Sequence, residues 1–157
     1  MSFVTLESAK LHLRVDGTDE DALIGVYITA AEQMAIALLD RGVYADGTAL
    51  GAARAAALAG LAAATATYTA AIAAAQALAD TTEQAAATQA AEYAYLRAQV
   101  AYRQTMDGIV VHDTIKSAVL LIVGHLYAHR EDVVAGVSVA KLPNGAEWLL
   151  APYKVYA

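Results

Sequence analysis

Residues 51–79, GAARAAALAGLAAATATYTAAIAAAQALA, decide the fold of this chain. Alanine has the strongest helix propensity of all residues, and residues 51–100 contain 24 alanines and no proline. The segment Asp80-Thr81-Thr82-Glu83 then interrupts this composition with two candidate N-caps, each followed three residues later by Glu or Gln. We therefore expect two antiparallel helices, at about 50–79 and 82–106, joined by a short turn.

Larger side chains recur along both expected helices at spacings of three and four residues, as they do in coiled coils. These positions are Leu58, Leu61, Thr65, Tyr68 and Ile72 on the first helix, and Gln89, Tyr93, Leu96, Val100 and Arg103 on the second. We expect them to face the partner helix, with the alanines permitting a close approach. A disordered low-complexity linker is the alternative, but such segments are usually charged and poor in helix formers.

The flanking sequences predict a small helical bundle. Thr5 is a good N-cap for a short helix that ends at Asp16-Gly17. Thr18 or Asp19 caps an amphipathic helix that ends near Gly42. A further helix begins at Asp113 or Thr114 and is apolar on every side over residues 118–123, which indicates burial.

Near the C-terminus, alternation over residues 137–142 predicts a short extended arm, and a last short helix at 146–150 ends before Pro152. The expected fold class is therefore all-α. We expect residues 1–43 and 108–157 to form a small helical bundle, with a long alanine-rich antiparallel helical hairpin inserted at 44–107 and the extended arm near the C-terminus.

Composition excludes several classes of protein. The chain has no cysteine, which excludes disulfide frameworks and thiolate metal sites. Its net charge of −6 argues against a basic surface for nucleic acid. Residues 55–79 carry no charge, but alanine is nearly neutral in hydrocarbon and large apolar residues are sparse, so we expect no contact with a membrane.

The candidate chemistry is sparse. His125 and His129 are four residues apart on one helical face, a spacing that can bind zinc, and His112 or Asp113 is the nearest further ligand. Two histidines at a helix C-terminus are also stabilised by the helix dipole, and we favour that interpretation. The serines, glycines and acidic residues form no recognised catalytic, phosphate-binding or calcium-binding motif. We expect no catalytic residue, no metal site and no cofactor, and we expect that the protein is not an enzyme.

Both ends of the chain resemble the tailed-phage head–tail connector (adaptor, head-completion) family. The opening TLESAKLHLRVD and the acidic phrase DALI resemble the start of that family, and IKSAVLLIVGHLYAHRE resembles its buried helix. The close, LPNGAEWLLAPYKVY, resembles its C-terminus. The positions that carry the motif in the core are Leu6, Ala9, Leu13, Leu23, Ile24, Tyr127 and Arg130.

The resemblance implies a structural subunit of the virion neck, assembled in the host cytoplasm. About twelve copies would form a ring under the portal protein. DNA would pass non-specifically through the channel, and a downstream neck, stopper or tail protein would dock below. The resemblance also implies that the C-terminal segment contacts the portal, through Leu149, Leu150, Pro152, Tyr153, Lys154, Val155 and Tyr156. A helical binding module of non-viral function is the alternative, and a histidine-based metal enzyme is a more distant one.

Overall fold

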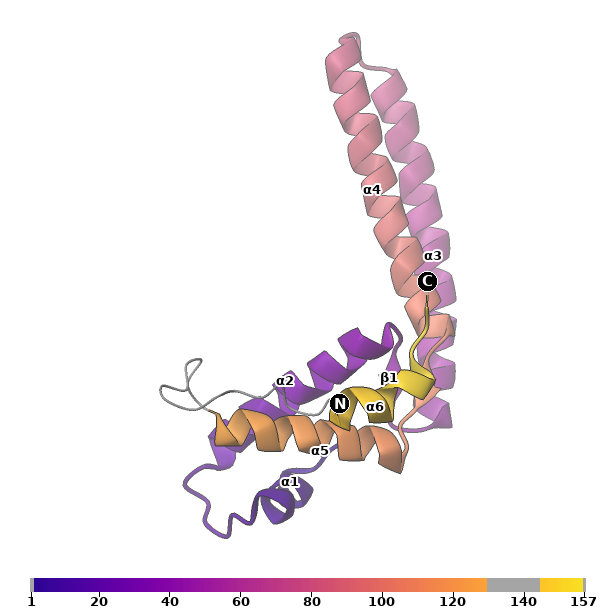
Figure 1. Ribbon diagram of the computed structural model, residues 1–157. Helices are drawn as coiled ribbons and strands as arrows, with labels where there is room; N and C mark the ends of the chain where they lie inside the picture. The colour runs from indigo at the N-terminus through magenta and orange to yellow at the C-terminus, as the bar shows by residue number, and fades with distance from the viewer. Residues whose placement is uncertain (1, 130–144, 157) are drawn as a thin grey trace. The chain divides into compact units, whose positions relative to one another are not determined.

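The computed structural model describes residues 2–129 and 145–156 and is mostly helical (Figure 1). The chain divides into two compact units, of which one comprises Met1–Asp46 and Ile109–Ala157 and the other Gly47–Gly108. The sequence prediction placed these boundaries after residue 43 and before residue 108. That the second unit is an insertion stays a prediction.

Helices α2 (Asp21–Leu39) and α5 (Asp113–Ala128) form the centre of the first unit. Helix α1 (Leu6–Leu13) contacts both, and α6 (Gly145–Leu150) packs mainly on α5 and leads into a single 3-10 turn at Ala151–Tyr153. The core is aliphatic and includes Ile24, Ile28, Ala31, Ala35 and Leu39 from α2, and Ile115, Ala118, Val119, Ile122 and Val123 from α5.

Polar contacts position α1 against this centre. The Thr5 hydroxyl caps α1 by accepting a hydrogen bond from the Ser8 amide at 3.1 Å, as the sequence predicted. Arg14 ends the helix in the left-handed conformation, with φ of 59°. An ion pair of 2.6 Å between Lys10 Nζ and Asp21 Oδ1 then joins α1 to the start of α2.

A buried carboxylate holds the N-terminal segment on α2. Glu32 is only 8% exposed, yet its Oε1 accepts hydrogen bonds from Ser2 Oγ at 2.7 Å, Phe3 N at 2.8 Å and Val4 N at 3.0 Å. A buried carboxylate is tolerated only when such donors replace its water. Nothing in the sequence pattern had identified Glu32, because one acid on an otherwise apolar helix predicts exposure.

A two-stranded parallel sheet closes the first unit where the chain leaves it. Strand β1 (Val43–Tyr44) pairs with β2 (Ile109–Val110), with Val43 opposite Ile109. Gly42 precedes β1, and a Cβ there would lie 2.7 Å from the Tyr44 ring, so a larger residue would require that ring to move. The all-α prediction is correct in class but missed this sheet, since two-residue strands show no alternation that a sequence pattern can reveal.

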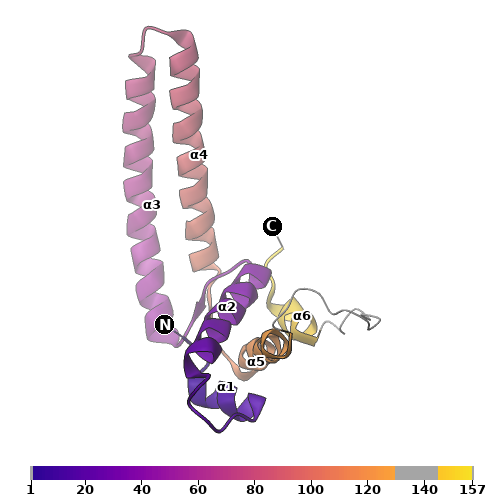
Figure 2. The ribbon, with the colours of Figure 1, turned by 90° about the vertical axis from the view of Figure 1, so that its left-hand side faces the viewer.

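The second unit is the expected helical hairpin. Helices α3 (Gly47–Gln76) and α4 (Thr81–Met106) lie side by side over their length (Figures 1 and 2). Asp80, one of the two predicted caps, begins α4 by accepting hydrogen bonds from the amides of Thr82 at 2.7 Å and Glu83 at 2.9 Å. These bonds, that of Glu83 foremost, lower the pKa of Asp80, so the charged cap persists until the pH falls through that lowered value.

The contact between α3 and α4 uses smaller residues than the sequence predicted. Leu61, Tyr68 and Ile72 are half-buried toward α4, but Leu58 is 61% exposed. On α4 the predicted face is wrong, since Tyr93, Leu96 and Val100 are 64, 58 and 44% exposed. The observed face again follows a heptad and contains Thr88, Ala91, Tyr95, Ala98 and Tyr102. Small side chains let the helices approach closely, and Tyr95 stacks on Tyr68 with ring centroids 4.9 Å apart.

Two of these helices, α2 and α3, are long and apolar enough to cross a membrane by length and composition alone. The inner face of α2 belongs to the core of the first unit, and a buried helix of a soluble protein has the same composition. Alanine supplies most of the hydropathy of α3. The absence of a membrane contact stays a prediction.

The predicted extended arm at 137–142 lies outside the described residues. Within the described part, the prediction of a mostly helical chain with a long packed hairpin is confirmed.

We expect Glu32→Ala to destabilise the first unit by about 3 kcal/mol, because the amides of Phe3 and Val4 would then lose their charged hydrogen-bond acceptor. Amide hydrogen exchange of peptides from α2 and α5 would measure this loss. Gln33→Ala is the matched control, since Gln33 is exposed and adjacent on α2. Equal protection in the two variants would contradict the role assigned to Glu32.

We expect Tyr95→Ala to lower the thermal unfolding midpoint of the hairpin by about 5 °C, because it removes the stack with Tyr68. Tyr93→Ala, two residues away on the same helix, should leave the midpoint nearly unchanged. Thermal unfolding followed by far-ultraviolet circular dichroism distinguishes them. A larger effect at Tyr93 would restore the contact face that the sequence predicted.

Candidate docking surface at the C-terminal end

The C-terminal segment is anchored to the core of the first unit along its length. Leu150, at the end of α6, is 2% exposed. The Tyr153 ring packs against His112, with centroids 4.4 Å apart. Beyond it, the Val155 amide donates a 3.0 Å hydrogen bond to the carbonyl of Leu39, the last residue of α2. The segment therefore presents a defined surface.

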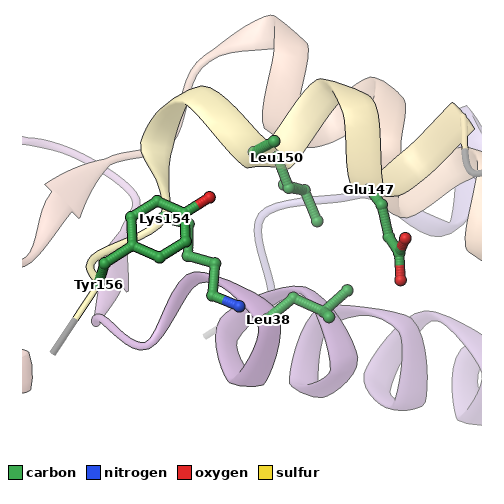
Figure 3. Close-up of a pocket in the computed structure, with 6 residues that line it drawn as sticks. Leu38, Glu147, Leu150, Lys154 and Tyr156 are labelled. Carbon is green, nitrogen blue, oxygen red and sulfur yellow. The ribbon is translucent and has the colours of Figure 1, made fainter.

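A shallow pocket of about 230 Å³ lies between α2 and this segment (Figure 3). It is lined by Leu38, Glu147, Leu150, Ala151, Lys154 and Tyr156. The Lys154 ammonium lies 5.5 Å from the centroid of the Tyr156 ring. The lining combines apolar surface with one acid and one base, a composition that suits contact with another protein.

The predicted portal-contact residues divide into two groups. Pro152, Lys154 and Tyr156 are exposed, and Tyr156 is 77% so. The other four are engaged with the protein itself: Leu149, Tyr153 and Val155 are half-buried, and Leu150 is buried. Leu150 fixes α6 in the core and is therefore not available to a partner while the unit is folded.

Sequence reasoning missed Trp148, the only tryptophan of the chain, which is 77% exposed on α6. The helical spacing between Trp148 and Leu150 could have identified it. Two residues along a helix correspond to a rotation of about 200°, so a buried Leu150 places Trp148 on the opposite, outer side. Exposed tryptophan is rare away from interfaces. We therefore add Trp148 to the candidate docking surface, which from here denotes Trp148, Pro152, Lys154 and Tyr156.

The family-motif positions are structural. Ala9 and Ile24 are fully buried, while Leu6, Leu13, Leu23 and Tyr127 are half-buried. The Tyr127 hydroxyl donates a hydrogen bond to a carboxylate oxygen of Glu20. Arg130 lies outside the described residues. The described motif positions therefore contribute to the packing of the bundle.

The histidine pair caps a helix. The rings of His125 and His129 lie with centroids 4.6 Å apart, and the His129 amide donates to the His125 carbonyl at 3.0 Å. Over residues 2–129 and 145–156, no three histidines or carboxylates gather closely enough to hold a metal ion. The pair thus lacks a third ligand within the described part of the chain.

Comparison with known proteins gives one match. No curated protein and no solved structure matches the chain. A family model described as "Phage gp6-like head-tail connector protein" matches residues 3–82, which include α1, α2 and α3. The C-terminal phrases of the sequence lie beyond that range. The family consists of structural connectors in the virion neck that assemble with other phage head and tail proteins, and they are not enzymes. With half of its length matched, the chain belongs to the phage gp6-like head–tail connector family.

Proposed function

We propose that the chain forms a ring under the portal of a tailed-phage capsid, with DNA passing through the channel and a neck or tail protein docking below. The family match over residues 3–82 carries the proposal. The copies assemble in the host cytoplasm, and about twelve is the expected number, in keeping with the cyclic symmetry of most homo-oligomers.

The candidate docking surface supplies the contact with the portal. Trp148 and Tyr156 are each 77% exposed although the segment that bears them is tied to the core. Aromatic anchors on a rigid element bind at little cost in conformational entropy, and they commonly dominate the energy of an interface. Pro152 adds rigidity, and Lys154 offers a charge for an acidic partner.

Net charge supports the passage of DNA. A channel wall rich in lysine and arginine would neutralise phosphates and hold the duplex in place. A chain with a net charge of −6 forms a ring that repels the duplex and lets it slide. A strongly basic lumen in the assembled ring would refute this part of the proposal.

Electron microscopy of the purified protein, alone and mixed with the portal, tests the proposed assembly. We expect rings, either free or seated on the portal, with the C-terminal end of each copy at the junction. Monomers or small oligomers that do not bind the portal would contradict the proposal.

Replacing Trp148 and Tyr156 together with alanine should weaken portal binding by about tenfold or more, as expected for aromatic hot spots. Sedimentation of the protein with assembled portal measures the change. Leu11→Ala is the matched control, because Leu11 is 82% exposed on α1, away from the docking surface. Equal losses in the two variants would remove the C-terminal end from the interface.

A further inference from the structure

The outer face of α4 carries large apolar side chains that stay exposed, although the Arg97 guanidinium lies 6.0 Å from the centroid of the Tyr93 ring. Tyr93, Leu96 and Val100 follow one another at spacings of three and four residues and are 64, 58 and 44% exposed. We call them the apolar ridge. They point away from α3, because the contact with α3 uses the series that contains Ala91, Tyr95 and Ala98. Contiguous exposed apolar side chains on a soluble protein mark a binding surface.

The outer face of α3 has the opposite character. Its exposed residues on the side away from α4 include Ala55, Ala59, Ala62, Ala66 and Ala73, which we call the alanine face, and Thr69 continues the same spacing between the last two. They too follow a near-heptad spacing, and residues 55–79 contain no charged side chain. A face made of small side chains offers shallow holes between them, into which larger side chains of another helix can insert.

We propose that the apolar ridge of one copy packs on the alanine face of the next copy, so that neighbouring hairpins join side by side in the ring. The two faces lie on opposite sides of one hairpin and differ in shape, large side chains on one and small on the other. Such a contact is heterologous, and repetition of it produces a ring or a filament.

The levels of the two faces favour the ring. The stack of Tyr68 on Tyr95 shows which residues lie at the same height in the hairpin. Both helices rise about 1.5 Å per residue in opposite directions. Leu96 therefore lies within one residue, about 1.5 Å, of the level of Ala66, and Val100 lies equally close to the level of Ala62. Ridge and face thus meet with almost no shift along the hairpin, which is compatible with copies related by rotation alone, as in a ring.

Charge is compatible with this occupant. Glu92 and Arg97 flank the ridge on its two sides, so both remain at the rim of the contact and in water. The alanine face is neutral. Arg103 continues the ridge series beyond Val100, but its long side chain can keep the guanidinium in water, so the contact need bury no ion. A bilayer is a poorer partner, because α4 carries Glu83, Glu92, Arg97 and Arg103 along its exposed surface.

The area of the contact determines how it must be detected. The alanine face runs over residues 55–73, so the contact is a strip about 28 Å long and about 10 Å wide, or about 280 Å² per copy. One such pair buries about 560 Å², less than a stable dimer needs, whereas a copy in a ring makes two of these contacts. An isolated pair is therefore short-lived, and covalent trapping is the suitable assay.

The absence of cysteine makes the trap specific. In the full chain, the double variant Ala66→Cys, Leu96→Cys should yield a ladder of disulfide-linked trimers and larger species under mild oxidation. The two positions face away from each other within one hairpin and cannot bridge in the same copy. Each single variant should yield dimers at most, and a mixture of the two singles should yield more dimer than either alone.

Two further substitutions in this double variant provide the matched control. Val100→Glu places a charge in the ridge and should reduce the ladder about tenfold, because the carboxylate would have to be buried unpaired. Ala101→Glu, at the next exposed position but off the ridge, should leave the ladder intact. Circular dichroism should show equal helix content in both variants.

Three results would overturn the proposal. They are the absence of species larger than dimer, dimerisation of Leu96→Cys alone as efficient as that of the mixture, and flotation of the wild-type protein with vesicles of phosphatidylcholine and phosphatidylglycerol. The inference rests on the proposed ring, yet the ladder forms without portal. A ladder with no portal binding would thus refute only the docking of the C-terminal end, and portal binding with no ladder would refute only the hairpin contact.

Discussion

The architecture depends on the short parallel pairing of Val43–Tyr44 with Ile109–Val110. The Ile109 amide donates to the Gly42 carbonyl at 2.9 Å, and the Val111 amide donates to the Tyr44 carbonyl at 2.7 Å. Parallel strands cannot be joined by a tight turn and need a long crossover. Here the crossover contains the helical hairpin, and the pairing joins the points at which the chain leaves and re-enters the first unit.

Features that depend on interactions between residues close in sequence could be predicted, whereas those that depend on distant residues could not. The hairpin, its turn and the cap at Asp80 were accessible because alanine propensity and capping act within a few residues. The face of α4 that contacts α3 could not be predicted in this way, because α4 carries two heptad series. The larger side chains belong to the exposed series, and the prediction chose that series. Packing of α3 against α4 selects the series with small residues, since it alone permits close approach. The role of Glu32 depends on amides of the N-terminal segment, and only the folded chain brings them together.

The same distinction applies to the candidate docking surface. Resemblance indicated the C-terminal segment but did not separate side chains that are buried in the core from those that remain exposed. Leu150 and Trp148 are two residues apart on α6, yet Leu150 is 2% exposed and Trp148 is 77% exposed. Motif positions such as Ala9 and Ile24 are likewise core residues. The described motif positions therefore report on the packing of the bundle and do not identify the residues of its exposed surface.

The heptad contact between α3 and α4 makes the length of the hairpin adjustable. Removing seven residues from each helix, at matching levels, would return every remaining contact to its own face and shorten the hairpin by about 10 Å. The cap at Asp80 uses only the amides of Thr82 and Glu83, which lie in the first turn of α4. The turn between the helices would therefore keep its structure at the end of the shortened hairpin. The length of the hairpin can thus change in steps of whole heptads while its fold stays the same.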